Sequence, residues 1–253
     1  MVSGKTLTEL QASKDNLTKS LEKEKEVNDL KSRFISMASH EFRTPLSTIL
    51  SSISLLAKYE TTEDQPKRDK HIDRIKSSVK TLTDILNEFL SLGKIEEGKI
   101  DVHFDTFNLK EFIDSVIYEM SILLKPGQTL VHHHQGELMI YSDSNLLKHV
   151  LVNLVSNAIK FSPENAPIEI ITQIEASKSL ISIIDKGMGI PKEDQVHLFE
   201  RFFRASNATN IQGTGLGLHI VGRYIDLIHG AIEYNSELEL GSQFIITLPN
   251  EQN

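Results

Sequence analysis

The chain has 253 residues and a formal net charge of −8, and its 39% hydrophobic content is sufficient for a folded core. The acidic balance argues against a protein that binds nucleic acid or an anionic membrane surface. No cysteine is present, which excludes disulfides and thiolate metal sites and fits a reducing compartment such as the cytoplasm. No apolar run approaches the ~18 residues that a membrane-spanning helix requires.

One long helix is predicted from about residue 6 to residue 58, because no glycine or proline interrupts the run from Lys5 to Thr44. Over residues 1–30 its leucines are spaced near a heptad, which is typical of a coiled coil. Further along, apolar residues recur at steps of three and four: Ile35, Ala38, Phe42, Leu46, Ile49, Ile53 and Leu56. His40 lies about 200° around the helix from that stripe, so we expect its imidazole to face solvent or a partner.

A second helix is predicted after a polar turn at residues 59–67. Its apolar residues also follow steps of three and four: Ile72, Ile75, Val79, Leu82, Leu86 and Phe89. Two helices joined by a short loop form an antiparallel hairpin. One hairpin cannot bury both stripes, whereas two hairpins related by a two-fold axis bury them in a four-helix bundle. We therefore expect a homodimer that carries His40 on its outer surface.

The second half of the chain predicts an α/β domain that starts at residue 97. Strands are expected near residues 100–107, 129–133, 138–141, 168–175, 180–184, 231–235 and 242–248. Helices are expected near residues 109–123, 144–161, 192–203 and 216–229. The triplet His132–His134 could suggest a metal site. Neighbouring strand residues point to opposite faces and no cysteine completes a site, so we expect no metal there.

Three local patterns in this domain point weakly to a nucleotide. Two asparagines four residues apart share one helix face and suit a hard cation such as Mg²⁺. An apolar strand ends at an aspartate–glycine turn, where backbone can approach a ligand closely. A glycine-rich loop precedes a helix, whose N-terminal N–H groups suit phosphate. The residues are Asn153 and Asn157, then Asp185, Gly187 and Gly189, and then Gly213, Gly215 and Gly217. Each pattern alone also fits a purely structural role.

Residues 34–46, FISMASHEFRTPL, resemble the phosphoacceptor box of sensor histidine kinases. The asparagines, the aspartate–glycine turn, a phenylalanine-rich helix and the glycine-rich loop resemble, in order, the N, G1, F and G2 boxes of the histidine-kinase ATP-binding domain. The resemblance covers residues 30–249. It implies a signalling coiled-coil helix over residues 1–30, then an all-α antiparallel hairpin forming a dimeric four-helix bundle over residues 31–96. An α/β sandwich of the Bergerat (GHKL) ATPase fold would follow over residues 97–253.

This resemblance implies that the chain binds ATP together with Mg²⁺. Asn157 is similar to the Mg²⁺ ligand, and Asn153 would lie beside the phosphates one turn earlier. Lys160 resembles a lysine that contacts phosphate, and Phe161 resembles an aromatic residue that packs by the adenine. Asp185 resembles the aspartate that accepts a hydrogen bond from the adenine amino group.

The resemblance also implies roles for the loops around the nucleotide. Gly187 and Gly189 would let the base approach the backbone, and Arg204 is similar to an arginine that reaches the γ-phosphate. The lid that would fold over the phosphates contains Gly213, Thr214, Gly215, Leu216 and Gly217. His149 departs from the family, which often has glutamine there, and we expect this change to matter little.

The implied activity is that of a protein-histidine kinase. His40 would take the γ-phosphoryl group of ATP, while Glu41 would either accept the proton of the other ring nitrogen or orient that nitrogen. The phosphoryl group would then pass to an aspartate of a response-regulator receiver domain, and Thr44 would position a water that dephosphorylates the regulator. The expected partners are a second copy of the chain and the regulator, with no nucleic acid and no membrane contact. An upstream sensor is expected to be missing, and the longer parent protein could be membrane-anchored.

Two other classes of function stay open. A degenerate kinase could act as a non-enzymatic dimeric scaffold, and an ATPase of the gyrase or MutL kind could act on DNA. The intact His40, Asn157 and Asp185 speak against the scaffold. The acidic charge and the histidine-bearing hairpin speak against the DNA enzyme.

Overall fold

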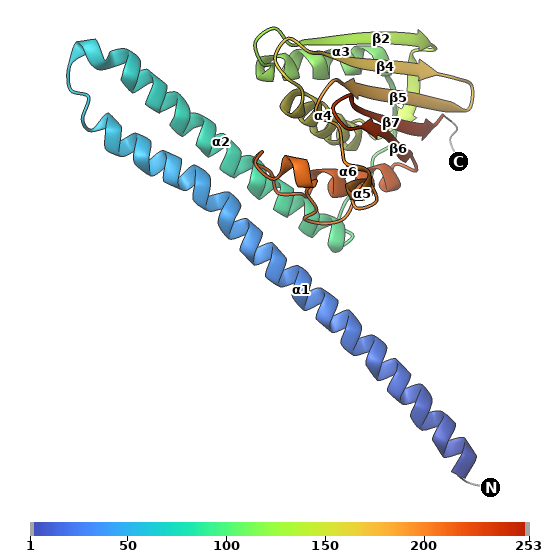
Figure 1. Cartoon of the computed structure of the whole chain (residues 1–253). Helices are drawn as coiled ribbons and strands as arrows, with labels where there is room; N and C mark the ends of the chain where they lie inside the picture. The colour runs from blue at the N-terminus through green and yellow to red at the C-terminus, as the bar shows by residue number, and fades with distance from the viewer. Residues whose placement is uncertain (1–2, 251–253) are drawn as a thin grey trace. The chain divides into compact units, whose positions relative to one another are not determined.

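Two compact units make up the protein, residues 1–83 and residues 84–253, in a computed structural model that describes residues 3–250 (Figure 1). The first unit contains α1 (Ser3–Leu56), η1 (Thr62–Asp64) and the first turns of α2 (Gln65–Glu96). This arrangement confirms the predicted helical hairpin, with α1 unbroken through Pro45. Most heptad side chains before residue 31, including Leu7 and Leu10, lie outside the described residues. None of the described helices is both long and apolar enough to cross a membrane.

The interior of the hairpin is partly polar. Glu41, Pro45 and Ser52 of α1 are buried, as are His71 and Ser78 of α2. Much of the predicted apolar surface of the first unit instead stays exposed. The exposed aliphatic side chains between residues 35 and 79 are Ile35, Leu46, Leu50, Ile53, Leu55, Ile72 and Val79. The hairpin alone therefore leaves apolar surface that a further helix pair would cover.

The second unit is built on a five-stranded sheet with the strand order β2-β4-β5-β7-β6. β2 runs parallel to β4, and all other neighbours in this sheet are antiparallel. A separate two-stranded sheet pairs β1 with β3. The strands are β1 (Asp105–Asn108), β2 (Thr129–Gly136), β3 (Met139–Ser142), β4 (Pro167–Ile174), β5 (Lys178–Asp185), β6 (Ala231–Glu237) and β7 (Gly241–Pro249).

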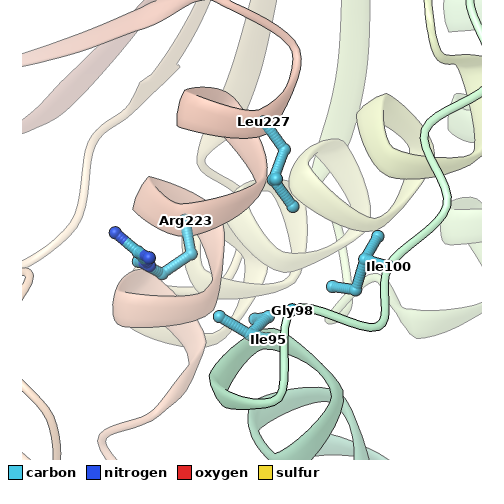
Figure 2. A pocket seen from close by; sticks show the side chains of 5 residues that line it. All are labelled: Ile95, Gly98, Ile100, Arg223 and Leu227. Atoms are coloured by element: carbon cyan, nitrogen blue, oxygen red, sulfur yellow. The ribbon is translucent and has the colours of Figure 1, made fainter.

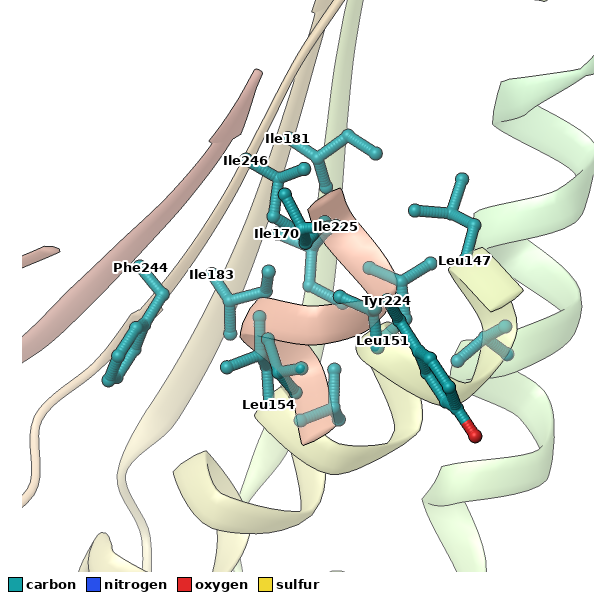
Figure 3. Packing of buried hydrophobic residues seen from close by; sticks show 14 of the residues in the cluster. Leu147, Leu151, Leu154, Ile170, Ile181, Ile183, Tyr224, Ile225, Phe244 and Ile246 are labelled. Carbon is teal, nitrogen blue, oxygen red and sulfur yellow. The ribbon is translucent and has the colours of Figure 1, made fainter. Parts of the chain in front are cut away.

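One face of this sheet packs against helices, which confirms the predicted α/β sandwich. Alternate residues of β5 are buried, and Figure 3 shows Ile181 and Ile183 facing Leu151 and Leu154 of α4. The last turns of α2 also contribute, because Leu92 belongs to the same buried cluster. The helices of this unit are α3 (Leu109–Met120), η2 (Ser121–Leu123), α4 (Ser144–Phe161), α5 (Lys192–Gln195), η3 (Ser206–Ala208) and α6 (Gly217–Leu227).

The core should respond sharply to a cavity at Leu151, whose side chain is 0% exposed. Leu151→Ala should lower the free energy of unfolding by about 2–5 kcal/mol, because it removes buried contacts and leaves a cavity. Ile122→Ala is the matched control, since Ile122 is 85% exposed and should change stability by less than about 0.5 kcal/mol. Chemical denaturation measures both, and equal losses would contradict this assignment of the core.

Two predicted elements are shorter than expected. The helix predicted over residues 192–203 is helical only as α5, because His197 N and Glu200 N donate to carbonyls three residues back, at 3.1 and 2.9 Å, and form turns instead of continuing the α-helix. Further on, Phe202 adopts a positive φ of 64° and donates its N–H to Gly215 O at 3.0 Å. That backbone geometry cannot continue a right-handed helix. The strand predicted over residues 100–107 is reduced to β1, whose only partner within the described chain is the four-residue strand β3.

Candidate functional site

The candidate phosphoacceptor lies on α1. The His40 side chain is 74% exposed, and its Nδ1 lies 3.5 Å from Oε1 of Glu41, whose side chain is only 5% exposed. Thr44 is exposed one turn further on. The helix therefore presents the imidazole to solvent with a largely buried carboxylate beside one ring nitrogen. In that arrangement the other ring nitrogen is available as a nucleophile.

The two asparagines of α4 form a linked pair in the second unit. Asp143 caps this helix by accepting hydrogen bonds from the N–H groups of Asn145 and Leu146, each at 2.9 Å. Asn157 Nδ2 donates to Asn153 Oδ1 at 3.2 Å, so both amides share one face, as predicted. Because Asn157 uses its amide nitrogen in this bond, its Oδ1 is the atom that suits a hard cation.

The glycine-rich loop packs directly against this pair. A β-carbon at Gly217 would lie 2.7 Å from Asn153 Nδ2, closer than any side chain tolerates. A residue with a side chain at position 217 would therefore displace the Asn153 amide, where α6 begins beside α4. The N-terminus of α6 and the asparagine face of α4 consequently meet, and this meeting brings together two of the predicted nucleotide motifs.

Sequence reasoning missed the two side chains that hold the C-terminal end of α4. Lys125 Nζ donates to Lys160 O at 2.8 Å and to Ser162 O at 2.6 Å. Gln128 Nε2 donates to the carbonyls of Ile159 and Pro163 at 3.2 and 3.0 Å. These bonds satisfy helix-end carbonyls and place a positive charge where the helix dipole favours it. They fix the turn from which Lys160 projects.

The aspartate–glycine turn follows β5 and lies against the same helix end. Asp185 is 8% exposed and its Oδ1 accepts a hydrogen bond from Gly187 N at 2.7 Å. A β-carbon at Gly187 would lie 2.9 Å from Phe161 O, which explains the need for glycine there. Gly189 has a positive φ of 65°. The turn therefore presents a buried carboxylate beside the backbone of α4.

Burial raises the pKa of the Asp185 carboxyl above its ordinary value of 3.8, against the opposing effect of hydrogen bonds from Gly187 and Ser242. Because the folded protein binds this proton more tightly than the unfolded chain does, protonation of Asp185 adds to the free energy of unfolding. That contribution is complete at pH values below the carboxyl pKa in the unfolded chain, and it is lost as the pH rises through the higher pKa in the folded protein. We expect the Asp185 carboxyl carbon to titrate above pH 3.8 in ¹³C NMR spectra, and nucleotide affinity to fall as it protonates. Titration below that value would contradict this account of the turn.

The lid between α5 and α6 is held by side chains from several elements. Lys160 Nζ donates to Gln212 O and lies 5.0 Å from the Phe161 ring centroid. Thr214 Oγ1 donates to Glu88 Oε2 and accepts from Leu216 N at 3.1 Å. Leu216 is 0% exposed, so this predicted lid residue anchors the loop to the core.

Arg204 lies within the lid, and its Nη2 contacts backbone carbonyls of the lid itself. The predicted contact with a γ-phosphate stays a prediction. Gly213 lies beside Lys160, since a β-carbon there would come within 3.0 Å of Nζ. Gly215 adopts a positive φ of 70°, which a residue with a side chain would take up only under strain.

Two histidines of β2 are engaged by protein groups. His132 Nδ1 lies 2.7 Å from Asp114 Oδ1, and its Nε2 lies 2.9 Å from Thr172 Oγ1. His134 Nδ1 lies 2.8 Å from the same hydroxyl, and its Nε2 lies 2.9 Å from Glu137 O. All four ring nitrogens are thus already hydrogen-bonded. Among the side chains that the structure describes, no group of three histidine, aspartate or glutamate residues is arranged to hold a metal.

A small cavity lies away from these motifs, between the end of α2 and α6. Ile95, Gly98, Ile100, Arg223 and Leu227 line about 60 Å³ of space (Figure 2). Pockets for drug-sized ligands measure roughly 300–1,000 Å³, so this cavity is too small for a nucleotide. The motifs predicted to bind a nucleotide meet elsewhere, where α4, the Asp185 turn and the lid contact one another.

Two family profiles match the chain. Residues 30–98 match the His Kinase A (phospho-acceptor) domain. Residues 142–252 match the histidine kinase-, DNA gyrase B-, and HSP90-like ATPase domain. The first match contains His40 and the second contains the asparagines, the Asp185 turn and the lid.

Similar proteins agree with these profiles. The sensor protein GacS of Pseudomonas syringae pv. syringae is 37% identical over 88% of this chain and 25% of its own length. The autoinducer 2 sensor kinase/phosphatase LuxQ of Vibrio parahaemolyticus is 33% identical over 85% of this chain and 26% of its own length. The chain thus spans about a quarter of the length of these curated relatives.

The histidine kinase ThkA is similar in structure as well. Its catalytic domain superposes with a TM-score of 0.52 at 32% identity, covering 58% of this chain and 96% of that domain. In its complex with the response regulator protein TrrA, ThkA superposes with a TM-score of 0.63 at 26% identity. That comparison covers 86% of this chain and 61% of ThkA.

Proposed function

Because this chain belongs to the sensor histidine kinases of two-component systems, with a HisKA hairpin followed by a HATPase_c domain, we propose that it phosphorylates its own His40 from Mg-ATP and passes the phosphoryl group to an aspartate of a response regulator. The supporting observation is that one chain contains both parts that the reaction needs. The exposed imidazole of His40 lies beside the buried carboxylate of Glu41, and an ATPase domain follows at residues 142–252. The ATPase profile supports ATP as the nucleotide.

Magnesium is expected to bind at Asn157. The amide oxygen of Asn157 is a hard ligand, and Mg²⁺ usually takes only one or two protein ligands together with phosphate oxygens and water. When bound, the cation neutralises charge on the phosphates. The positive end of α6 beside Asn153 and the ammonium of Lys160 would add to that neutralisation.

The proposed transfer uses the two ring nitrogens of His40 differently. Its Nε2 lone pair forms the new N–P bond as the bond between the γ-phosphorus and the bridging oxygen breaks, and ADP leaves with that oxygen. The Nδ1 proton passes to Glu41, whose Oε1 lies 3.5 Å away. In-line positioning supplies most of the rate, because phosphoryl transfer needs little covalent help from protein groups.

A homodimer is the expected assembly. The exposed aliphatic side chains of α1 and the first turns of α2 leave apolar surface that a second hairpin would bury in a four-helix bundle. His40, with its side chain 74% exposed, would stay accessible on such a bundle. Substituting the exposed Leu46 and Leu50 with charged residues should shift the species seen by light scattering from dimer to monomer.

A response regulator is the expected acceptor of the phosphoryl group. ThkA crystallised with the response regulator TrrA, and LuxQ carries both kinase and phosphatase in its name. We expect Thr44→Ala to weaken dephosphorylation of the regulator about tenfold or more and to leave autophosphorylation largely intact, because Thr44 is exposed one turn from His40. Equal loss of both activities would contradict this division of labour.

Incorporation of label from γ-³²P-ATP tests the proposed kinase activity directly. Wild-type protein should become labelled in the presence of Mg²⁺, whereas His40→Gln should take up no label. The non-enzymatic scaffold predicts no label in either protein. His133→Gln is a matched control, because His133 is exposed on β2 of the other unit, and it should label normally.

A further inference from the structure

Arg204 forms the centre of a compact lid. Its Nη2 lies 3.1 Å from Ala208 O and 2.9 Å from Thr209 O, and it also donates to Ile211 O. Backbone hydrogen bonds tighten the same segment, from Ala208 N to Ala205 O at 2.9 Å and from Ile211 N to Ala208 O at 3.1 Å. Three carbonyl dipoles thus converge on one guanidinium nitrogen, and that convergence is favourable only around a positive charge.

Both ends of this segment are fastened to the neighbouring motifs. At its start, Ser206 donates both its N–H and its hydroxyl to Asp194 Oδ2, each at 2.7 Å. Asn207 Nδ2 donates to Gly189 O at 2.9 Å, which joins the lid to the aspartate–glycine turn. At its end, Lys160 of α4 donates to Gln212 O. Side chains of α5 and α4 and the backbone of the aspartate–glycine turn therefore hold both ends of this segment.

We propose that Arg204 is a positioning residue that folds the first part of the lid, residues 204–212, before a nucleotide binds. The inference deepens the proposed function and rests on it only for the effect on ATP and ADP. Arg204 occupies the lid carbonyls, so these oxygens are not available to face and repel phosphate. If the lid is folded only part of the time, the apparent Kd equals the Kd of the folded form divided by the fraction folded. This factor is the same for ATP and for ADP. A contact with the γ-phosphate alone would weaken ATP and spare ADP.

Hydrogen exchange of the nucleotide-free protein tests the folding role. In Arg204→Ala, the amides of Ala208 and Ile211 should exchange about tenfold faster than in wild type, while amides of β4, β5 and β7 stay protected. Arg204→Lys should fall between the two, because an ammonium keeps the charge but lacks the planar fork. Arg223→Ala, an exposed arginine of α6, should leave the lid amides unchanged. Unchanged lid exchange in Arg204→Ala would overturn the proposal.

Titration calorimetry with Mg-ATP and Mg-ADP separates the two roles of the side chain. Arg204→Ala should weaken both nucleotides by the same factor, about tenfold if the lid is folded one tenth of the time. A loss confined to ATP would overturn the proposal in favour of a γ-phosphate contact alone. Failure of wild type to bind either nucleotide would refute the proposed kinase function, while the exchange experiment would still decide whether Arg204 folds the lid.

Discussion

Asn157→Ala should lower the initial rate of autophosphorylation by about a hundredfold or more at any Mg²⁺ concentration. The substitution removes the amide oxygen expected to hold the cation and also breaks the bond from Asn157 Nδ2 to Asn153 Oδ1 at 3.2 Å. The phosphates would then lose both charge neutralisation and alignment. Initial rates of label incorporation, measured over a range of Mg²⁺ and ATP concentrations, give the size of the effect.

Asn145→Ala is the matched control, because Asn145 lies on the same helix with an exposed side chain. It should keep a near wild-type rate. A rate for Asn157→Ala within a few fold of wild type would show that the cation is held elsewhere. Circular dichroism of all three proteins checks that the helix content is retained.

Gly189→Ala should both destabilise the α/β unit and abolish nucleotide binding. A β-carbon at Gly189 would lie 2.0 Å from Glu237 O, and its φ of 65° is disfavoured for any side chain. Displacing this turn from the β6–β7 hairpin should cost more than about 2 kcal/mol. It would also move the carbonyl that accepts the lid bond from Asn207.

Gly93→Ala is the opposite control. Nothing lies within 4 Å of a β-carbon at Gly93, which is in the last turns of α2, so alanine should be neutral or stabilising by up to about 1 kcal/mol. Thermal unfolding and nucleotide titration of the two variants measure the contrast. Similar behaviour of the two variants would contradict the close packing of the aspartate–glycine turn.

The spacing of apolar residues along the chain predicted most helices and strands, and it placed the candidate motifs on them. The helix periodicity around His40 and the Asn153–Asn157 spacing predicted exposure and a shared face, and both hold in the structure. These features depend on residues close together in the chain, whose geometry follows from the helical repeat. The roles of the predicted site residues in catalysis and nucleotide binding stay predictions.

Contacts between distant residues were not predictable in the same way. Lys125 caps a helix end 35 residues away in the chain, and a lysine in a loop carries no local sign of such a partner. At the end of the helix predicted over residues 192–203, Phe202 donates its N–H to Gly215, a residue of the glycine-rich loop, and not to a carbonyl of its own helix. In each case tertiary hydrogen bonds decided the outcome over local preference.

The most direct measurement is mass spectrometry of the wild-type protein after incubation with Mg-ATP, with peptides kept at alkaline pH. One phosphoryl group should be found on the peptide that contains His40, and it should be lost on brief treatment with acid, as a phosphoramidate is. No phosphorylated peptide, or an acid-stable phosphate on a serine or threonine, would contradict the assignment of His40 as the phosphoacceptor.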